Sequence, residues 1–397
     1  MSKLGLNILY LGCPGFPYGL AEVQRVLLIS KALVNERAKV TVICSKSIHS
    51  KNTYPELKKA GHYQGIPYIY SSGIPYRYKN FIMRNSIKLF EKILEFILIY
   101  KLNKKEKIDA AIVSSMNIKH VLLYKVLSKL LNFKVVLNLV EINSAMSTRK
   151  SVYLKINDYL FDRYAVSLSD GILPISEHLI SFIKEIDFKK PYLKVPVIVD
   201  IDRFSGIEKE SSEEYFLYCG AALYYELIFF IIESFELIKG ERSYLYLVIN
   251  GSDSHLSAIN SRVNDSVKSD SIKVFSRISE KQLSLLYKNA LSLLIPLRPT
   301  IQDKARFPHK TGEYLASGNP VITTNFGEMS YYLKDMDNAL VASRFDVKEF
   351  SDKMNQVLIY PNECLIIGAQ GKLTAEKYFD YKIYGAKIID FITELSK

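Results

Sequence analysis

A cluster of basic residues stands in front of a short helix in the second half of the chain. Arg306, His309 and Lys310 fall in a loop, the pattern predicts a helix over Thr311–Ser317, and Gly318 would cap its C-terminus. A helix N-terminus presents free backbone N–H groups, and Arg and Lys are the usual partners of phosphate. These residues therefore predict a diphosphate site at the mouth of a parallel sheet, with His309 as a further donor to phosphate.

Two acidic residues follow this cluster in the sequence. Glu313 falls in the first turn of the predicted helix, where its carboxylate can accept two hydrogen bonds from a ribose diol. Its alternative role is to offset the helix dipole. Glu328 follows the predicted strand Pro320–Thr324, and ligands bind at the carboxyl ends of parallel strands. Both carboxylates are therefore candidate ligand-binding groups.

A glycine-rich turn, Gly12–Ala21, follows the first predicted strand. Gly15 would let backbone N–H groups approach an anion at the start of the next helix, although an ordinary tight turn explains the same glycines equally well. The spacing is not G-x-G-x-x-G, and no acidic residue closes a second strand at the required distance. NAD-dependent redox chemistry is therefore not favoured.

Glu141 is the candidate polar residue of the first half, because it ends the predicted strand Lys134–Val140. It would either orient an acceptor hydroxyl or cap the next helix, and the two interpretations are level. Asp200-Ile-Asp202 imitates a metal-binding D-x-D motif but follows no nucleotide-binding strand, so a structural role is favoured. Other residues lack metal-ligand spacing, and we expect neither a metal nor a cofactor.

The composition is that of a globular protein with two domains. The 397 residues are 48% hydrophobic and 24% charged, which excludes a disordered chain and is enough for two cores. The four cysteines stand far apart, so we expect reduced thiols and a cytoplasmic protein. The short apolar run Leu4–Leu11 predicts a buried strand rather than a signal peptide, and no run of about 18 apolar residues predicts a membrane span.

The positive charge is confined to the first half. Residues 1–200 contain 30 Lys and Arg against 15 Asp and Glu, whereas the remainder contains 23 against 26. Such a surface suits an anionic membrane, a lipid-phosphate acceptor or a nucleic acid, but no nucleic-acid-binding motif is present. Residues 76–107 predict a basic amphipathic helix that either packs in the core or lies on an anionic membrane, and these alternatives are level.

Strand-like apolar runs alternate with helical patterns along the whole chain. This predicts an α/β fold with two Rossmann-like, doubly wound parallel sheets. The predicted strands are Leu6–Leu11, Lys39–Cys44, Tyr68–Tyr70, Ala110–Val113, Lys134–Val140, Gly171–Pro174, Tyr215–Gly220, Tyr244–Gly251, Ile272–Phe275, Ser292–Pro296 and Pro320–Thr324. We expect an N-terminal domain over residues 1–198 and a C-terminal domain over 199–375. An amphipathic helix over about 376–397 would pack back on the first.

The segment FPHKTGEYLASGNPVITTNFGE resembles the donor-site signature of the retaining GT-B glycosyltransferases, the large family numbered four. ILPISEHLISFI, VPVIVDIDRF, YFLYCGAAL and YLVINGSDS resemble further segments of that family in the same order. The resemblance is strong over about residues 171–345 and architectural before them. It implies the GT-B fold, with two domains facing across a cleft, and an N-terminal domain that binds the acceptor. It also implies transfer of a sugar from a nucleoside-diphosphate sugar to a glycan or lipid-linked acceptor.

The resemblance also implies roles for single residues. Glu313 matches the second Glu of the family's E-x7-E motif, which contacts the nucleotide ribose, but Ala305 replaces the first, which contacts the donor sugar. That contact must come from Asp303 or from the backbone of residues 307–310, including Phe307, Pro308 and Lys310. Some members carry an F-P-x-K form of the loop, as here.

The glycine loop at Gly220 lacks the Arg and Lys that usually follow it in the family and hold the diphosphate. The substitutes that this chain offers are Arg277, Lys304, Arg306 and Lys310. Glu328 resembles an acidic loop residue of the family. The resemblance implies a retaining transfer in which the leaving diphosphate helps to deprotonate the acceptor, without an enzymic nucleophile. Glu141, His309 and Lys310 are the candidate catalytic residues.

The basic first half suits a polyprenyl-diphosphate-linked acceptor in bacterial surface polysaccharide synthesis. We therefore expect a hexosyltransferase that is cytoplasmic or peripheral on the inner face of the plasma membrane. A nucleotide-sugar epimerase is an alternative, but it would need an acid–base pair that the first half does not show convincingly. A catalytically inactive scaffold is another, because Ala305 and the loop at Gly220 weaken the donor site.

Overall fold

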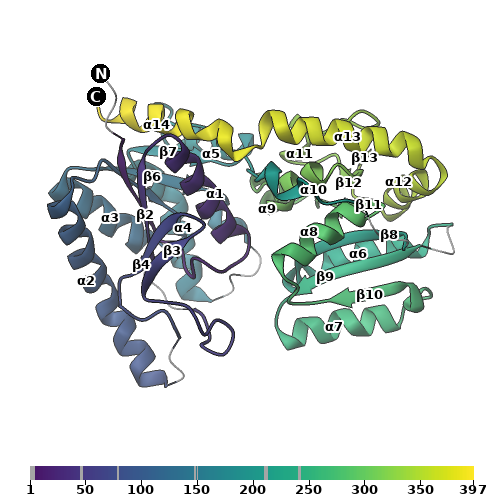
Figure 1. Ribbon diagram of the computed structural model, residues 1–397, viewed down its shortest axis with the longest axis horizontal. Coiled ribbons are helices and arrows are strands. Elements are labelled where there is room, and N and C mark those ends of the chain that lie inside the picture. Colours follow the sequence, from purple (N-terminus) through teal and green to yellow (C-terminus); the bar gives the residue numbers. More distant parts are fainter. Residues whose placement is uncertain are drawn as a thin grey trace. The chain divides into compact units, whose positions relative to one another are not determined.

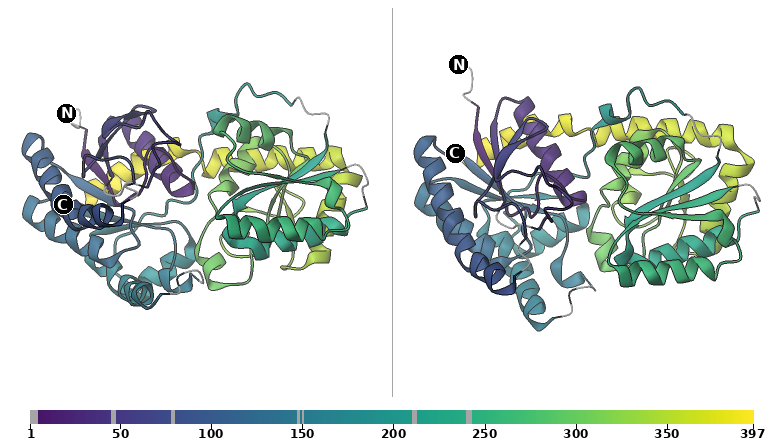
Figure 2. Two further views of the ribbon diagram at one scale, coloured as in Figure 1. Left: turned by 90° about the horizontal axis from the view of Figure 1, so that it is seen from below. Right: turned by 60° about the horizontal axis from the view of Figure 1, so that its bottom comes forward.

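The computed structural model describes residues 5–44, 48–77, 80–146, 149, 151–209, 213–239 and 243–397, and for residues 81–89 it describes the backbone alone. Contacts divide the chain into two units (Figure 1). Unit 1 comprises residues 1–198 and 381–397, and unit 2 comprises residues 199–380. Each unit is a largely parallel sheet covered by helices on both faces, which Figure 2 shows from two further directions.

The described part of unit 1 contains a sheet with the strand order β3-β4-β2-β1-β5-β6-β7. Its strands are β1 (Asn7–Leu11), β2 (Lys39–Cys44), β3 (Ala60–Tyr63), β4 (Ile66–Tyr70), β5 (Ala110–Val113), β6 (Lys134–Leu139) and β7 (Gly171–Pro174). β1 pairs in parallel with β2 and β5, whereas β3 runs antiparallel to β4. The central strands are almost continuous apolar runs because helices cover both of their faces.

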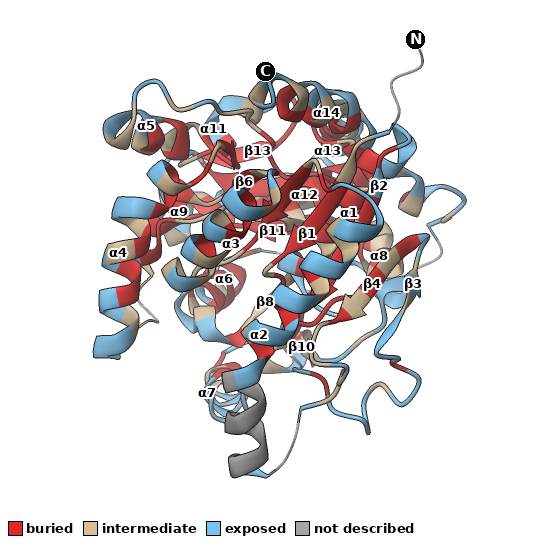
Figure 3. Cartoon of the chain, turned by 90° about the vertical axis from the view of Figure 1, so that its left-hand side faces the viewer, coloured by how far each residue is buried: buried red, intermediate tan, exposed pale blue. Residues whose placement is uncertain are grey.

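Helices α1 and α14 cover one face of this sheet, and α2 and α3 cover the other, with α4 packed against α3. Their bounds are α1 (Ala21–Asn35), α2 (Phe81–Lys105), α3 (Ile118–Leu131), α4 (Val152–Leu168), α5 (Glu177–Ile186) and α14 (Tyr384–Leu395). Figure 3 shows the buried strands of unit 1 behind the partly exposed outer faces of α2, α3 and α4. α14 approaches α1 so closely that a Cβ at Gly385 would lie 2.3 Å from the carbonyl oxygen of Ala32.

The single helix predicted over about residues 376–397 is wrong, because two helices occupy this region. α13 (Pro361–Tyr378) ends before Phe379, and α14 begins at Tyr384 after a short 3₁₀ turn. Phe379 is fully buried in unit 2, whereas Tyr381 and Tyr384 are buried in the core of unit 1. The chain changes from one core to the other within these residues, and a straight helix would not supply both contacts.

The described part of unit 2 contains a sheet with the strand order β10-β9-β8-β11-β12-β13, and each of its pairings is parallel. The strands are β8 (Tyr215–Ala221), β9 (Tyr244–Asn250), β10 (Ile272–Phe275), β11 (Ser292–Ile295), β12 (Val321–Thr324) and β13 (Leu340–Ala342). The chain crosses from β10 to β11 between the edge and the middle of the sheet. The order reverses between β8 and β11, and α/β sheets bind ligands outside the carboxyl ends of their strands at such a point.

α6, α7 and α12 pack together on one side of this sheet, and α8, α10 and α13 pack together on the other. Their bounds are α6 (Tyr225–Glu236), α7 (Asp253–Asn264), α8 (Glu280–Asn289), α10 (Lys310–Ser317) and α12 (Val347–Ile359). The short helices α9 (Ile301–Ala305) and α11 (Met329–Tyr332) lie in the loops that follow β11 and β12. Among the described residues, no helix combines the length and the apolar character needed to cross a membrane.

The predicted strands agree with the structure to within two residues at their ends, and several coincide with it. β3 and β13 were not predicted. β3 has the sequence AGHY, which lacks β-branched residues, and β13 has three residues. Gly318 ends α10 with a φ of 82°, as its predicted role as a C-terminal cap requires.

Candidate active site

Lys310 lies at the carboxyl end of β8. As the first residue of α10 it reaches back to the strand, where its Nζ donates to the carbonyl oxygen of Cys219 and lies 4.1 Å from the ring centroid of Tyr218. Desolvation by the surrounding protein lowers the pKa of Lys310 to about 8, and the nearby positive charge of Arg306 contributes to the shift. This ammonium group is therefore costly in the ligand-free site, and an anion bound beside it would stabilise it.

Arg306 is held by a buried carboxylate and an aromatic ring. Its Nη2 lies 2.7 Å from Oδ1 of Asp303, and its guanidinium lies 4.6 Å from the ring centroid of Tyr224. Nε of Arg306 is buried and has no hydrogen-bond partner among the described residues. A buried N–H without an acceptor is rare in proteins, and a phosphate oxygen is an acceptor that suits a guanidinium.

Arg298 is a further cation at this edge of the sheet, and no sequence pattern predicted its role. Its Nε donates to Oδ2 of Asp303 over 3.1 Å, and its Nη1 donates to Glu226 over 2.8 Å. Asp303 therefore lies between two arginines and is fully buried. The suggestion that Asp303 contacts a donor sugar is wrong for this reason. The sequence did contain a signal for this pairing, because Asp303 is only five residues after Arg298 and three residues before Arg306.

Glu313 lies in the first turn of α10, as predicted, and is 9% exposed. Its Oε1 accepts a hydrogen bond of 2.7 Å from Nη1 of Arg203, and its Oε2 accepts one of 3.4 Å from Tyr287. Arg203 also donates to Oγ of Ser284 over 2.7 Å. A carboxylate oxygen can accept two hydrogen bonds, so Glu313 retains acceptor capacity for a diol. No local pattern predicted the role of Arg203, which is 110 residues away in the sequence.

Glu328 is brought to the same edge by the loop after β12. Gly327 has a φ of 60°, and a Cβ there would lie 2.8 Å from the carbonyl oxygen of Asp303, so this loop lies directly against α9. Glu328 is 1% exposed. Phe307 is also buried, stacked on Tyr332 at 5.6 Å between ring centroids. In this structure Phe307 therefore contacts the core below the loop.

The remaining predicted residues of unit 2 lie at different distances from Lys310 and Arg306. Pro308 and His309 are half-buried and directly precede α10. Gly220 follows Cys219 in β8. Arg277 is exposed at the end of β10, two strands from β8, which corresponds to about 10 Å across a sheet. Lys304 is exposed on α9.

Unit 1 carries a different group at its sheet edge, formed by two carboxyl groups. Glu141 follows β6 and is half-buried, and Glu22 lies in the first turn of α1, where the residue as a whole is exposed. Desolvation of its carboxyl group, with the negative charge of Glu141 as the second cause, raises the pKa of Glu22 to about 7. Glu22 was not predicted as a site residue, and the only signal for it in the sequence is its place directly after the glycine-rich turn. Glu22 can therefore bind a proton near neutral pH, and Glu141 acts on it through its charge.

The glycine-rich turn is anchored by its carbonyl groups. The Gly15 carbonyl oxygen lies 2.5 Å from Nε2 of His49, and the Phe16 carbonyl oxygen accepts a hydrogen bond of 2.8 Å from Tyr70. Gly15 has a φ of 79°, and Gly12 approaches the carbonyl oxygen of Ser114 so closely that a Cβ would lie 2.7 Å from it. Close packing therefore explains these glycines, and the anion-binding role of Gly15 stays a prediction.

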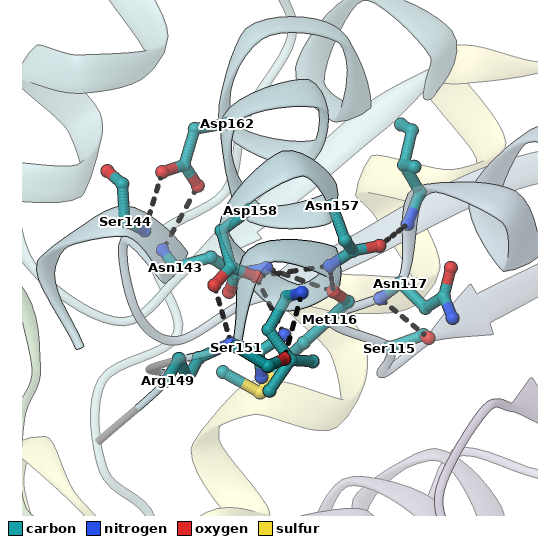
Figure 4. Close-up of polar contacts among 12 residues, drawn as sticks. Ser115, Met116, Asn117, Asn143, Ser144, Arg149, Ser151, Asn157, Asp158 and Asp162 are labelled. Carbon is teal, nitrogen blue, oxygen red and sulfur yellow. Dashed lines mark hydrogen bonds and ion pairs between the residues drawn. The ribbon is translucent and has the colours of Figure 1, made fainter. Parts of the chain in front are cut away.

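The loops that follow β5 and β6 are tied together by α4 (Figure 4). Nδ2 of Asn157 donates to the carbonyl oxygen of Met116 over 2.8 Å, and Asp162 accepts from the backbone N–H groups of Asn143 and Ser144. Arg149 is paired with Asp158, at 2.7 Å, in the same cluster. Because these contacts order the segment that follows β6, they also fix the backbone next to Glu141.

Among the described residues, no three His, Cys, Asp or Glu side chains come together in a group that could hold a metal ion. The Asp200-Ile-Asp202 sequence lies at the start of a short 3₁₀ helix, Ile201–Phe204. This turn also carries Arg203, so it positions the guanidinium group that donates to Glu313.

Residues 200–374 match the family model described as "Glycosyl transferases group 1". Unit 2 is therefore a glycosyltransferase domain. The match covers unit 2 almost from end to end, including each of the cations and carboxylates described above for that unit. No curated protein sequence matches the chain.

Solved structures show that the chain has the GT-B fold. Sucrose-phosphate synthase from Thermosynechococcus elongatus is 14% identical with a TM-score of 0.77, and the match covers 98% of this chain and 99% of that one. HepE from Anabaena, in complex with UDP and glucose, is 12% identical with a TM-score of 0.71, covering 98% and 100%. WaaG, a glycosyltransferase involved in lipopolysaccharide biosynthesis, is 14% identical with a TM-score of 0.66, covering 98% and 100%.

Proposed function

We propose that this protein moves a hexose, with retention of anomeric configuration, from a nucleoside-diphosphate sugar to a lipid-linked or glycan acceptor. The observation that carries the proposal is the group of cations at the carboxyl end of β8. Lys310 and Arg306 lie together beside the start of α10, one with a lowered pKa and the other with a buried N–H that has no acceptor among the described residues. A diphosphate would satisfy both groups.

The parts of the donor are assigned to neighbouring residues. The diphosphate binds Lys310 and Arg306, while Arg298 balances the charge of Asp303 from below. The ribose diol binds Glu313, whose two oxygens are already oriented by Arg203 and Tyr287. The backbone of residues 307–310 contacts the sugar in place of the Glu that Ala305 replaces. The neighbour HepE contains UDP and glucose, which supports a uridine donor as the first candidate.

The proposed chemistry needs no nucleophile from the protein. The bond between the anomeric carbon and the diphosphate oxygen breaks, and the acceptor oxygen bonds to the same face of that carbon. The acceptor proton passes to the departing diphosphate, whose increased charge is stabilised by Lys310 and Arg306. Cations that are positioned before the reaction stabilise this charge without rearrangement, so their contribution is larger in the transition state than in the ground state.

The acceptor is proposed to bind unit 1 and to belong to bacterial surface polysaccharide synthesis. The basic composition of this half supports a lipid phosphate acceptor at an anionic membrane. The neighbour WaaG is involved in lipopolysaccharide biosynthesis, which supports the same setting. Glu141 orients the acceptor hydroxyl, and Glu22 supplies a carboxyl group that titrates near neutral pH beside it.

One observation favours a second candidate function, a nucleotide-sugar epimerase. Glu22 and Glu141 form the pair of interacting carboxyl groups that such an enzyme needs for proton transfer. The two functions differ in their products. An epimerase converts the nucleotide sugar without any acceptor, whereas a transferase releases a nucleoside diphosphate only as the sugar moves.

The test is calorimetric binding of UDP-, GDP-, ADP- and CMP-sugars to wild type and Glu313→Ala, followed by product analysis for the sugar that binds. We expect one nucleotide to bind, and Glu313→Ala to lose both affinity and the preference for ribose over 2′-deoxyribose. The matched control is Asp352→Ala, an exposed acid on α12 of the same unit. Folded wild-type protein that binds none of the sugars would refute the proposal.

A further inference from the structure

The helix α2 is inverted with respect to an ordinary surface helix. From Phe90 onward, where its side chains are described, its carboxylates point inward: Glu91 is 8% exposed and Glu95 is fully buried. Glu95 accepts hydrogen bonds of 2.7 Å from Tyr124 and 2.6 Å from Lys92. Polar pairing of this kind fixes one face of the helix against the protein. The opposite face is therefore fixed toward the outside.

The outward face of α2 is apolar. Its large exposed side chains are Phe90, Ile93, Leu94, Phe96, Ile97 and Tyr100, and Ile93 has 56% of its surface accessible. An ordinary helix would bury these residues and expose the two glutamates. The polar contacts of Glu95 prevent the helix from rotating, so the apolar stripe stays on the surface. Large exposed apolar patches mark interaction sites.

Two neighbouring helices extend the same surface. α3 packs against both α2 and α4. The exposed apolar residues of α3 are Leu122, Val126 and Leu130, and those of α4 are Val152, Tyr153, Ile156, Tyr159 and Tyr164. Figure 3 shows the three helices on one side of unit 1 with parts of their outer faces exposed. We call these apolar residues and the basic residues among them the α2–α4 face.

The charge on the α2–α4 face has a single sign. The exposed basic residues of the three helices, from Phe90 onward, are Lys101, Lys104, Lys105, Lys119, Lys129, Lys155 and Arg163. The acidic residues of the same described segments are Glu91, Glu95, Asp158 and Asp162, which are buried or half-buried. Lysines therefore flank the apolar stripe, and the exposed carboxylate next to them, that of Glu106 after the end of α2, is paired with Lys39. A partner with an apolar interior and an anionic surface is complementary to this arrangement.

We propose that the α2–α4 face docks on an anionic phospholipid bilayer. The described outer stripe of α2, from Phe90 to Lys105, is about 24 Å long, and helices of this kind insert their apolar side chains among the acyl chains while lysines contact the headgroups. The docking proposal depends on the proposed function in one respect, because a bilayer would present the lipid-linked acceptor to unit 1. Docking itself requires neither donor nor acceptor.

The helix α13 in unit 2 supplies a comparison within the same chain. It also exposes large apolar residues, including Ile366 and Leu373, which are 64% and 55% exposed. It differs in that exposed acids, Glu363 and Glu376, lie among them. An anionic bilayer would repel those carboxylates, so α13 offers control positions that are, as a pair, at least as exposed as those of α2 but have a different charge pattern.

The experiment is co-sedimentation of the full chain with phosphatidylcholine vesicles and with vesicles that contain an equal share of phosphatidylglycerol. We expect binding to the anionic vesicles. Lys101→Gln/Lys104→Gln/Lys105→Gln should reduce the partition coefficient about 100-fold, at about five-fold per lysine, and added salt should shrink this difference. Ile93→Glu/Ile97→Glu should abolish binding, whereas Ile366→Glu/Leu373→Glu should leave it unchanged.

Three results would overturn the proposal. They are absence of wild-type binding to anionic vesicles, equal loss in the α13 variant, and a wild-type dimer that Ile93→Glu/Ile97→Glu converts to a monomer without vesicle binding. The last would assign the face to a second copy of the chain. Circular dichroism and donor binding by unit 2 verify that each variant is folded. Vesicle binding is measured without donor, so its failure is distinct from failure of the proposed transfer.

Discussion

The two units present opposite chemistry at equivalent edges of similar sheets. In unit 2 the carboxylates are paired with arginines, as Glu313 is with Arg203, and Lys310 lies at the end of the central strand. In unit 1 two carboxyl groups, Glu22 and Glu141, interact with each other. One edge therefore suits an anion, and the other suits a hydroxyl group that donates hydrogen bonds. The common fold supplies the crevice, and a few side chains decide what it binds.

The buried arginine of unit 1 extends this contrast. Arg25 donates to Asn138 over 3.0 Å and to the backbone carbonyl groups of Val195 and Pro196. Its acceptors are neutral, and burial lowers its pKa to about 10. It thus holds the segment that leads into unit 2 without creating an anion site. An arginine is evidence for phosphate binding only where its donors remain available, as Nε of Arg306 does among the described residues.

The largest effect that separates the two edges is expected from Arg203→Ala. Glu313 would remain buried without its cation, which should lower the free energy of unfolding of unit 2 by about 3 kcal/mol. Denaturant titration with circular dichroism, and hydrogen exchange at α10, measure this loss. The double variant Arg203→Ala/Glu313→Gln removes both charges and should recover part of the stability. Equal destabilisation of the single and double variants would contradict the pairing.

The next effect concerns Lys310 and depends on pH. Its pKa of about 8 implies that nucleoside-diphosphate affinity is constant at lower pH and falls as pH rises through 8, where the amine becomes neutral. Lys310→Met should weaken binding roughly 10- to 100-fold at neutral pH, because a charge-assisted hydrogen bond is lost. Calorimetry across this range measures both effects. Lys310→Arg keeps its charge, so a persistent fall near pH 8 in that variant would assign the titration to another group.

Glu22 should produce a smaller effect on stability, with a defined sign. Its pKa of about 7 lies above the ordinary value of 4.5, so the folded state binds the proton more tightly. The contribution to stability is present at low pH and is lost as pH rises from about 4.5 through 7. Glu22→Gln should therefore flatten the Tm profile over this range, and Glu141→Gln should move its midpoint to lower pH. The control is Glu36→Gln, at the C-terminal end of the same helix, α1. A Glu22→Gln Tm profile identical to that of wild type would reject this prediction.

The smallest effect is expected from Tyr224→Ala. The ring of Tyr224 lies 4.6 Å from the guanidinium of Arg306, and a partly exposed cation–π contact contributes about 0.5–1 kcal/mol. Donor affinity should fall about two- to five-fold, which calorimetry resolves. Tyr225→Ala, whose ring contacts Phe229 instead, should have no effect. Equal losses in the two variants would show that the contact with Arg306 is not responsible.

Local patterns predicted much of the fold and part of the candidate site. β2, β5 and β7 lie at their predicted residues, and α10 places Glu313 in its first turn with Gly318 as its cap. Apolar runs, turn residues and helix caps act over a few residues, so they can be read without tertiary information. The same patterns did not distinguish a supporting residue such as Asp303 from one that contacts a ligand.

The pairing of distant residues was decided by the tertiary structure. Arg203 and Glu313 are 110 residues apart, and the charge of Glu141 acts on Glu22 only because the strands that precede them, β6 and β1, lie in one sheet. Whether a polar group is buried with or without a partner also depends on the assembled core, as the different surroundings of Arg306 and Asp303 show. One keeps a donor that no described residue satisfies, and the other is enclosed between arginines.

The sequence by itself determined two largely parallel α/β units, the position of their strands other than β3 and β13, and the basic loop before a glycine-capped helix in a chain whose positive charge lies in its first half. Only the tertiary structure decided that α2 turns its apolar side outward and that the C-terminal helix breaks at Phe379. The physical reason is that periodicity specifies the two faces of a helix but not which one is buried. That choice depends on the partners that the rest of the fold supplies, here Tyr124 for Glu95 and a separate core for each side of the break.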